Sequence, residues 1–459
     1  MHRLIVLAGI VIALGTVAHA QEKRPNVLFL VTDDQRADTI AALGNGVIKT
    51  PNLDKLAQRG FVFRNAYCMG STVGAVCNPS RHMLLSGKGL YHYRAKDATG
   101  TMGEVLRRLG YFTFLISKRG NTATAYHAAF EINGYLEDDK ERKSGHHGRT
   151  AAEKTIDFLK SWKKAPLTPG PSPSEGRGEK ARPFFAYVGF EGPHDPRVAA
   201  PEWLNLYDRA KVPLPKNFMA FHPFNSGDLL IRDEQLAPWP RSEDTVRKHL
   251  HDYYACISSI DHQIGRILAA LQELGELDNT IIIFTSDHGL AIGSHGLFGK
   301  QSLYEHSMKS PLIFAGPGIP KGQTDAFAYL FDIYPTTLDL VRGKAPAGLD
   351  GKSLAPVMQG KEKAVRDTVF LSYRDVQRAV RKDEWKLIRY PKVDYTQLFN
   401  LRDDPDEMKN LALEPAHAKR VRDMMDLLAQ QQKLFSDTAP LVVDNPQPAK
   451  VDISFFKKK

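Results

Sequence analysis

Asn26-Val27-Leu28-Phe29-Leu30-Val31-Thr32-Asp33-Asp34 is the stretch that decides the fold of this chain. An apolar run ends directly in two aspartates, which is the pattern of a strand buried on both faces of a sheet and followed by a polar loop. The same pattern returns in Thr280-Ile281-Ile282-Ile283-Phe284-Thr285-Ser286-Asp287-His288-Gly289. Because ligands of α/β sheets bind beyond the carboxyl ends of the strands, we expect the two acidic ends to belong to one site.

Helical and strand-like segments alternate outward from these two strands. Helices are expected at 50–58, 101–109, 150–162 and 244–274, and further strands at 112–116, 184–190 and 311–315. This alternation predicts a layered α/β sandwich. Beyond about Gly343, short runs at 368–373, 385–390 and 397–400 predict a smaller sheet, and a final helix is expected at 415–434.

Two segments are expected to lie outside this framework. Residues 1–20 combine a basic start with an apolar run and end in Ala18-His19-Ala20, which is typical of a signal peptide. The run is too short to span a membrane, so we expect a periplasmic or secreted protein without a membrane span. Residues 165–182 are rich in Pro, Gly and Ser and predict a flexible insertion. The expected division is a signal peptide (1–20), a large α/β domain (21–342) and a smaller C-terminal subdomain (343–459).

The composition excludes a mainly disordered chain, because 42% of the 459 residues are hydrophobic and 25% are charged. Lys and Arg number 62 against 52 Asp and Glu, and this net charge of +10 favours anionic partners such as nucleic acid, acidic lipid or a sulfated or phosphorylated sugar. The basic tail Lys457-Lys458-Lys459 lacks the interleaved aromatic residues of nucleic-acid binding, so we expect no nucleic-acid partner. Three cysteines allow at most one disulfide, and whether Cys68 pairs with Cys256 stays open.

The remaining cysteine, Cys77, lies in the most informative motif, Cys77-Asn78-Pro79-Ser80-Arg81, which continues to Leu85-Ser86-Gly87. This motif resembles the C-x-P-S-R signature of sulfatases. In that family a maturase oxidises the cysteine before export to formylglycine, an aldehyde whose hydrate attacks the sulfate ester. The hydrate's second hydroxyl allows sulfate to leave by C–O cleavage, whereas a serine sulfate needs a second displacement. The alternative interpretation of Cys77 is a buried free thiol beside a turn.

The resemblance extends along nearly the whole chain after residue 20. Residues 398–407, Leu-Phe-Asn-Leu-Arg-Asp-Asp-Pro-Asp-Glu, are similar to the L-F-D-L-x-x-D-P-x-E segment of the family's smaller domain. The pattern is closest to bacterial secreted sulfatases that act on sulfated glycans. The resemblance therefore implies a sulfuric ester hydrolase with a large mixed β-sheet between helices, followed by a smaller C-terminal domain with a short antiparallel sheet and a helix.

A divalent cation is implied by the acidic ends of the two strands. Asp33, Asp34 and Asp287 offer the hard oxygen ligands that Ca²⁺ prefers, and without a cation they would repel one another. The resemblance implies that Cys77, as the hydrated aldehyde, and His288 complete the metal site. Imidazole is softer than Ca²⁺ prefers, so we expect Ca²⁺ but leave Mg²⁺ as the second choice.

Four further residues resemble the family's anion-binding groups. Arg81, one helical turn after Cys77, is expected to point at the nucleophile and the bound anion. His194, in Gly192-Pro193-His194-Asp195-Pro196, resembles the P-H-x-P histidine that contacts sulfate and protonates the leaving alcohol. Lys118 and Lys300 resemble the two lysines that reach the sulfate.

The sequence departs from the family at Gly120. Relatives read G-K-W-H where this chain has Ser117-Lys118-Arg119-Gly120, so the histidine that assists the hydrate's second hydroxyl is missing. His127 and His92 are candidates for this role only because they are histidines. We therefore assign the role to no residue.

Two other functions stay open beside the hydrolase. The departure at Gly120 leaves open the hypothesis that the protein binds sulfated glycans and hydrolyses them slowly or not at all. A phosphoryl hydrolase of the same superfold would need Ser or Thr as nucleophile and usually two metals. Without residues 1–20, 61 Lys and Arg stand against 52 Asp and Glu, and this charge of +9 suits a polyanionic sulfated polysaccharide. Aryl and choline sulfates stay open as substrates.

Overall fold

The computed structural model describes residues 24–136, 143–164 and 182–451. The predicted signal peptide lies outside the described residues, and so does the predicted insertion apart from Arg182.

A mixed sheet of nine strands forms the centre of the larger part of the molecule. Its strands are β1 (Asn26–Thr32), β2 (Phe61–Tyr67), β4 (Phe112–Lys118), β5 (Ile132–Leu136), β6 (Phe184–Gly189), β7 (Thr280–Ser286), β8 (Lys309–Ser310), β9 (Leu312–Ala315) and β10 (Gly322–Tyr329). They lie in the order β10-β2-β9-β7-β1-β6-β4-β5, with β8 beside β2. β1 is parallel to β6 and β7, whereas β9 is antiparallel to β7 and β2. The predicted large mixed sheet is confirmed.

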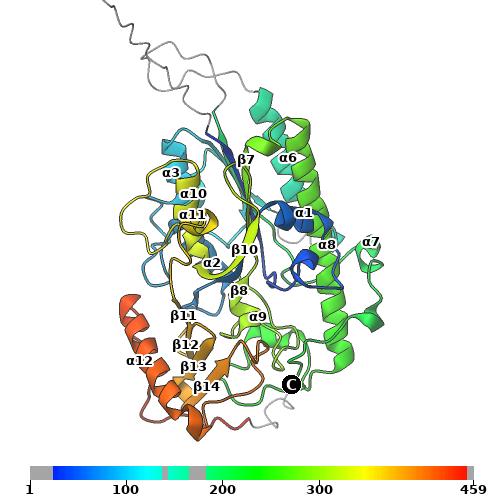
Figure 1. Ribbon diagram of the computed structural model, residues 1–459. Helices are drawn as coiled ribbons and strands as arrows, with labels where there is room; N and C mark the ends of the chain where they lie inside the picture. Colours follow the sequence, from blue (N-terminus) through cyan, green and yellow to red (C-terminus); the bar gives the residue numbers. More distant parts are fainter. Residues whose placement is uncertain (1–23, 137–142, 165–181, 452–459) are drawn as a thin grey trace, which may run out of the picture.

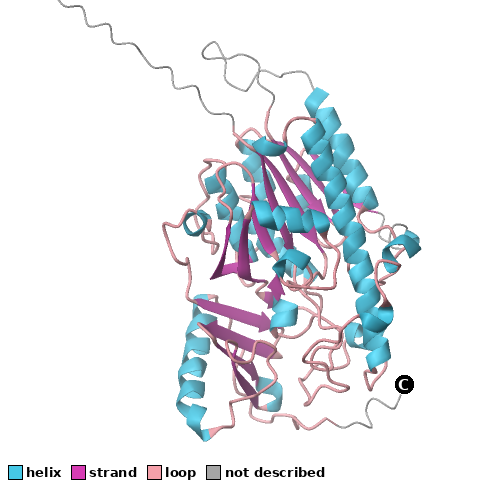
Figure 2. Ribbon diagram, turned by 45° about the vertical axis from the view of Figure 1, so that its right-hand side comes forward, coloured by secondary structure: helices cyan, strands magenta, loops and turns pink. Residues whose placement is uncertain are grey.

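Helices cover both faces of this sheet (Figures 1 and 2). One face carries α1 (Pro51–Arg59), α6 (Arg149–Lys164) and α8 (Glu243–Glu273), and the other carries α2 (Cys77–Ser86), α3 (Met102–Arg108) and α10 (Ile333–Leu340). Successive side chains of β1 point to opposite faces, so Leu28 belongs to the same apolar cluster as Ile264 of α8 and Phe29 to that of Leu84 of α2. This two-sided burial explains why β1 and β7 are continuous apolar runs.

A second, smaller sheet lies below the large one in Figure 1. It consists of β3 (Gly70–Ser71), β11 (Thr368–Tyr373), β12 (Gln377–Lys382), β13 (Trp385–Tyr390) and β14 (Tyr395–Asn400), in the order β14-β13-β12-β11-β3. The strands from β11 to β14 are antiparallel, and α12 (Ala418–Leu434) packs against them. The predicted small antiparallel sheet and C-terminal helix are therefore present. β3 joins this sheet from the segment that leads to Cys77.

A partly buried carboxylate ties the two sheets together. Glu305 lies in the short helix α9 (Glu305–Met308) and accepts hydrogen bonds from Lys386 Nζ of β13 at 2.9 Å and from Arg381 Nη1 of β12 at 3.0 Å. It also accepts one from the Tyr67 hydroxyl of β2 at 2.8 Å. Because a buried charge is costly without partners, this cluster fixes the small sheet against the large one.

Short elements complete the described chain. They are α4 (Thr124–Ala128), α7 (Pro201–Leu204), α11 (Ala355–Met358) and the 3-10 turns η1 (Ala41–Leu43), η2 (Arg209–Lys211), η3 (Arg232–Leu236), η4 (Leu277–Asn279), η5 (Leu330–Asp332), η6 (Pro391–Val393) and η7 (Pro415–His417). All three cysteines are free, so Cys68 and Cys256 do not pair in this structure. Within the described ranges, no helix is long and apolar enough to cross a membrane.

Asp261 of α8 caps the start of α1 and generates a pH-dependent stability. Its carboxylate accepts from the backbone N–H groups of Leu53 at 2.7 Å and Asn52 at 3.1 Å, and from the Asn52 amide at 2.9 Å. Burial raises the pKa of Asp261 from 3.8 to about 6, although these hydrogen bonds oppose the shift. The folded chain therefore holds this proton more tightly than the unfolded chain, and the corresponding stability is lost as pH rises from about 4 through 6.

We expect the free energy of unfolding of the wild type, relative to Asp261→Asn, to fall by about 3 kcal/mol between pH 4 and pH 7. Urea unfolding at several pH values measures this difference. Asp157→Asn, at an exposed position of α6, is the control and should show no such trend. A flat difference for Asp261→Asn would contradict the prediction.

Candidate active site

The predicted site residues meet beyond the carboxyl ends of β1 and β7. Thr32 and Ser286 are paired across these strands, so the aspartates that follow them emerge side by side. The backbone N–H of Asp287 donates to the Thr32 carbonyl at 3.2 Å, and the backbone N–H of Asp34 donates to Asp287 Oδ1 at 3.0 Å. The parallel register of two buried strands thus sets the spacing of the carboxylates.

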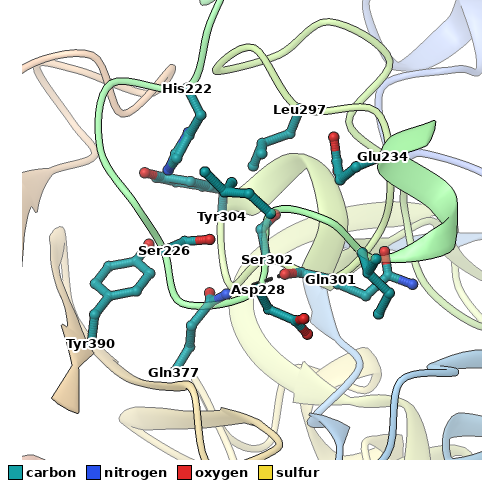
Figure 3. Close-up of a pocket in the computed structure, with 12 residues that line it drawn as sticks. His222, Ser226, Asp228, Glu234, Leu297, Gln301, Ser302, Tyr304, Gln377 and Tyr390 are labelled. Carbon is teal, nitrogen blue, oxygen red and sulfur yellow. Dashed lines mark hydrogen bonds between the residues drawn. The ribbon is translucent and has the colours of Figure 1, made fainter. Parts of the chain in front are cut away.

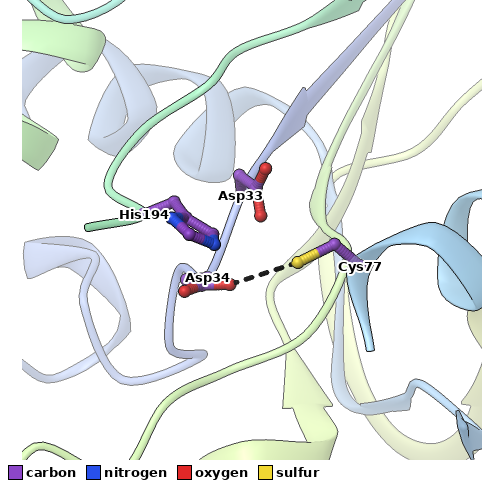
Figure 4. A group of neighbouring side chains, drawn as sticks. All are labelled: Asp33, Asp34, Cys77 and His194. Carbon is purple, nitrogen blue, oxygen red and sulfur yellow. Dashed lines mark hydrogen bonds between the residues drawn. The ribbon is translucent and has the colours of Figure 1, made fainter. Parts of the chain in front are cut away.

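Cys77 is the first residue of α2 and points into this cluster (Figure 4). Its Sγ lies 3.1 Å from Lys300 Nζ, 3.2 Å from His288 Nε2 and 3.6 Å from Asp34 Oδ1. Burial, followed by the charge of Asp33, raises the pKa of the thiol well above its usual value, although Lys300 opposes the shift. The unmodified side chain is therefore a neutral thiol and a poor nucleophile.

The three carboxylates form a buried acidic cluster. Asp33, Asp34 and Asp287 are at most 1% exposed, and ligand atoms lie within 4.8 Å of one another in two overlapping groups, Asp33–Asp34–Cys77–His194 and Asp33–Cys77–Asp287–His288. Asp33 Oδ1 is buried and has no hydrogen-bond partner among the described residues. An unpartnered carboxylate oxygen beside two further carboxylates fits a hard divalent cation.

His288 has the tautomer that a metal ligand needs. Its Nδ1 lies 2.9 Å from the carbonyl oxygen of Gly289, and because a carbonyl only accepts, Nδ1 carries the hydrogen. The lone pair of Nε2 then faces Cys77 Sγ, with Asp34 Oδ1 at 3.4 Å. His288 thus offers an acceptor atom at the same place as the carboxylates.

Positive side chains surround the carboxylates. Arg81 is fully buried, and its Nε donates to Asp287 Oδ2 at 3.1 Å while Nη2 lies 3.8 Å from Asp33 Oδ2. Lys300 Nζ donates to Asp34 Oδ1 at 2.9 Å. Burial raises the pKa of Asp33, but Lys118, His194, Arg81 and Lys300 together hold it well below its usual value. The carboxylate of Asp33 is therefore ionised.

Arg81 follows Cys77 by one helical turn, as the sequence predicts. Besides the two aspartates, its guanidinium contacts a backbone carbonyl and a tyrosine hydroxyl. Nη2 donates to the Thr32 carbonyl at 3.2 Å, and Nη1 donates to the Tyr187 hydroxyl at 3.4 Å. These bonds fix the guanidinium between β1, β6 and the acidic cluster.

His194 lies on the opposite side of the cluster from Cys77, with its ring turned toward Asp34 in Figure 4. Its Nδ1 lies 2.7 Å from the carbonyl oxygen of Asp195, which leaves Nε2 as the ring nitrogen available to a ligand. Lys118 is half-buried at the end of β4, and its charge acts on Asp33. The structure thus brings all nine predicted site residues to one place.

The segment that departs from the family pattern is held against the site by two asparagines. Asn78 Nδ2 donates to the Gly120 carbonyl at 2.6 Å, and Asn121 Nδ2 donates to Asp33 Oδ2 at 2.6 Å. Sequence reasoning missed Asn121, whose one signal is its place just after β4, beside Lys118. Asn121 thus binds Oδ2 of Asp33, whereas Oδ1 of the same carboxylate has no hydrogen-bond partner among the described residues.

The two histidines considered for the missing role lie elsewhere. His127 is buried and stacks on the ring of Tyr135, with ring centroids 4.3 Å apart. His92 pairs with Asp350 at 2.8 Å and with the Ser436 hydroxyl at 3.0 Å. Neither belongs to the group of ligand atoms around Cys77.

A small cavity lies just beyond Lys300, between the small sheet and the loop that carries Gln301 (Figure 3). Its volume is about 10 Å³, room for about one water molecule. His222, Ser226, Tyr304, Gln377 and Tyr390 are among its lining residues. It is too small for a sugar, so the leaving group of a substrate does not lie there.

Comparison with known proteins gives concordant results. The family model for "Sulfatase" matches residues 25–344, and the model for "N-sulphoglucosamine sulphohydrolase, C-terminal" matches residues 293–434. The chain is 27% identical to an N-acetylglucosamine-6-O-sulfatase of Bacteroides thetaiotaomicron, over 95% of this chain and 91% of the relative. It is 31% identical to a sulfatase of Formosa agariphila, over 85% of this chain and 83% of the relative.

Solved structures share the fold. One is a protein in complex with its substrate D-glucosamine-2-N,6-O-disulfate, with a TM-score of 0.73, 24% identity and coverage of 91% of this chain and 99% of that one. Another is the phosphonate monoester hydrolase of Agrobacterium radiobacter, with a TM-score of 0.69, 24% identity and coverage of 90% and 96%. At these identities the likeness concerns the fold alone.

Gly189 of β6 is where the site leaves no room for a larger residue. A Cβ at this position would lie 2.8 Å from Arg81 Nη1 and 3.0 Å from Ser117 Oγ. Because Arg81 is held by Asp287 and Thr32, we expect Gly189→Ala to displace it, lowering the stability by about 1–3 kcal/mol and the hydrolysis of an aryl sulfate by about tenfold or more. Thermal unfolding and initial rates measure these effects.

Gly134→Ala is the matched control on β5, because a Cβ there meets only the flexible end of Ile116 at 3.2 Å. It should leave the rate within a factor of about three. Equal rates for Gly189→Ala and the wild type would show that the placement of Arg81 does not depend on a glycine at residue 189.

Proposed function

The chain belongs to the sulfatase family of sulfuric ester hydrolases, and from that premise we propose that it removes sulfate from a sulfated glycan through formylglycine at position 77. The observation that carries the proposal is Cys77 at the start of α2, in contact with Lys300 and His288 and beside three buried carboxylates. The hydrated aldehyde would supply one hydroxyl as the nucleophile and a second hydroxyl whose deprotonation expels the bound sulfate by C–O cleavage and regenerates the aldehyde. A maturase partner is therefore part of the proposal.

We propose that Asp33, Asp34, Asp287 and His288, together with the oxygen at position 77, hold one Ca²⁺ ion. The support is the donor set, with three carboxylates in a buried cluster and an unpartnered Asp33 oxygen. Bound there, the cation would offset negative charge on the nucleophile and the sulfate. Asn121 and Arg81 each contact an aspartate of this set and orient it.

The remaining residues act on the substrate. Lys300 and Lys118 bind the sulfate oxygens and stabilise the charge that develops on them. His194 donates a proton to the leaving alcohol, and its Nδ1 contact with the Asp195 carbonyl fixes the ring for this role. Arg81 maintains the spacing between Asp33 and Asp287 through its charge.

A polyanionic glycan is the proposed substrate class. The charge of +9 without residues 1–20 favours such a substrate, and the Bacteroides relative is named for a sulfated hexosamine. We also propose a periplasmic or secreted location, the boundaries 21–342 and 343–459 for the two domains, and the insertion 165–182 as a segment without a catalytic part.

Mass spectrometry of the peptide that contains position 77 tests the proposed nucleophile. In protein from a host with a maturase, we expect a peptide about 18 Da lighter than the cysteine form and hydrolysis of 4-nitrophenyl sulfate. Cys77→Ala should abolish hydrolysis, because it removes the nucleophile. An unmodified thiol, in a host where another sulfatase matures, would instead favour a protein that binds sulfated glycans without turnover.

Calcium binding gives an independent test of the acidic cluster. We expect millimolar Ca²⁺ to raise the Tm and EDTA to reverse the effect, because a ligand of the folded state stabilises it. Asp34→Asn should weaken the apparent Ca²⁺ affinity by about tenfold or more, since it removes a charged ligand. Asp423→Asn, at an exposed position of α12, is the control. A Tm that does not change when Ca²⁺ is added would contradict the proposed metal site.

A further inference from the structure

Arg197 is a buried guanidinium with an unpartnered edge. It follows His194 by three residues and is only 9% exposed, and its Nε and Nη2 atoms have no hydrogen-bond acceptor among the described residues. The N–H groups of Nε and Nη2 share one edge of the planar guanidinium, which matches two oxygens of a carboxylate or a sulfate. Because arginine stays charged and a buried unpaired charge is unfavourable, this edge points to an anionic ligand.

Arg197 is connected to the predicted site residues through Tyr253 and Asp195. Its guanidinium stands 5.7 Å from the ring centroid of Tyr253, whose hydroxyl donates to the Asp34 carbonyl at 2.5 Å. Arg197 also acts on Asp195, whose carbonyl contacts His194. Since His194 is the proposed proton donor to the leaving oxygen and Arg197 follows it by three residues, the proposal places the departing sugar beside Arg197.

Arg232 is an exposed arginine that binds Asp195, the carboxylate on which Arg197 acts. Its side chain is 60% exposed, and its Nη1 donates to Asp195 Oδ1 at 3.0 Å and to Asp233 Oδ1 at 2.9 Å, while Nη2 contacts the other oxygen of Asp195. Asp233 in turn lies 3.9 Å from Lys300 Nζ. Arg232 therefore connects the segment of His194 with that of Lys300 across the site.

The carboxylates near Arg197 form hydrogen bonds with other cations. Asp195 is taken up by the bidentate pair with Arg232, and burial of Asp195 is outweighed by His194, Arg232 and Arg197, which lower its pKa to about 2. Asp233 is shared between Arg232 and Lys300. Arg197 therefore acts on Asp195 through its charge, while the hydrogen bonds of Asp195 and Asp233 described above go to Arg232.

We propose that Arg197, with Arg232 at the rim, forms a second anion-binding subsite that takes a carboxylate or an additional sulfate on the sugar carrying the scissile ester. The inference rests on the proposed function, because it uses the leaving-group side of that site. It narrows the substrate class from sulfated glycans in general to sugars with at least two anionic groups. The subsite would increase affinity for these sugars over singly charged sulfate esters.

The test is calorimetric binding to the full chain carrying Cys77→Ala, with Ca²⁺ present, so that no ligand is turned over. One pair of probes is N-acetylglucosamine 6-sulfate and glucosamine 2-N,6-O-disulfate, in which an N-sulfate replaces the neutral N-acetyl group. A second pair is glucose 2-sulfate and glucuronate 2-sulfate, in which a carboxylate replaces the neutral C6 hydroxymethyl group. We expect the added anion to tighten binding by about tenfold or more in at least one pair, as a charged hydrogen-bonded contact does.

Substitutions of Arg197 distinguish a loss of binding to the second anion from a loss of folding. Arg197→Met should bring the affinity ratio within each pair close to one, and Arg197→Lys should restore part of it. Arg209→Met, at an exposed arginine paired with Asp244, is the control and should retain the full ratio. Equal affinities within both pairs for the Cys77→Ala chain, or an unchanged ratio in Arg197→Met, would overturn the subsite.

The two proposals fail in different ways. If matured wild-type protein hydrolyses no sulfate ester, the proposed function fails, while the affinity ratios still report on the subsite. If the protein hydrolyses 4-nitrophenyl sulfate and both ratios are close to one, only the subsite fails.

Discussion

Three carboxylates held together away from water are the constraint on which the rest of the site depends. Asp33, Asp34 and Asp287 are almost fully buried, and their mutual repulsion is offset in this structure by Arg81 and Lys300. Repulsion of this kind is tolerated only where the backbone fixes the positions and compensating charges are close. The parallel pairing of β1 with β7 supplies the fixed positions, because it ends both strands at the same level.

The two sheets contribute to the site in different ways. The large sheet positions charged groups at the ends of β1, β4 and β7, whereas the small sheet stabilises the segments that reach over them. Gln377 of β12 shows the second role, because its side-chain amide donates to the carbonyl of Gln301 at 3.1 Å, next to Lys300. β3 pairs with β11 shortly before the chain reaches Cys77. The segments that carry Lys300 and Cys77 are thus both tied to the smaller sheet.

The apolar pattern predicted the strands that are continuous apolar runs and missed β2, β10 and β12, in which polar residues interrupt the run. β1, β7 and the long helix α8 were predicted within a residue or two, because burial enforces a continuous apolar run or a helical period. β10 begins with polar, exposed residues at the edge of the sheet, and β12 carries two arginines, so neither was predicted. Their strand conformation depends on partners that are distant in the sequence.

The same limit applies to the site. Strand ends and a specific motif predicted nine residues that the structure brings together, whereas Asn121, and Arg197 and Arg232 of the proposed subsite, lie on connecting segments that local sequence does not position. Their contacts join segments that are far apart, as in the bond from Asn121 to Asp33 and the pair of Arg232 with Asp195. Residues that orient or extend a site in this way carry no local signature.

The environment of Cys77 is itself an argument about chemistry. A thiolate is the reactive form of cysteine, yet burial and the charge of Asp33 raise the pKa of this thiol well above its usual value, and Lys300 does not compensate. A site built for cysteine nucleophiles would place cations, not carboxylates, around the sulfur. The carboxylates therefore work against a thiolate at position 77, which agrees with the proposal that the nucleophile is an oxygen.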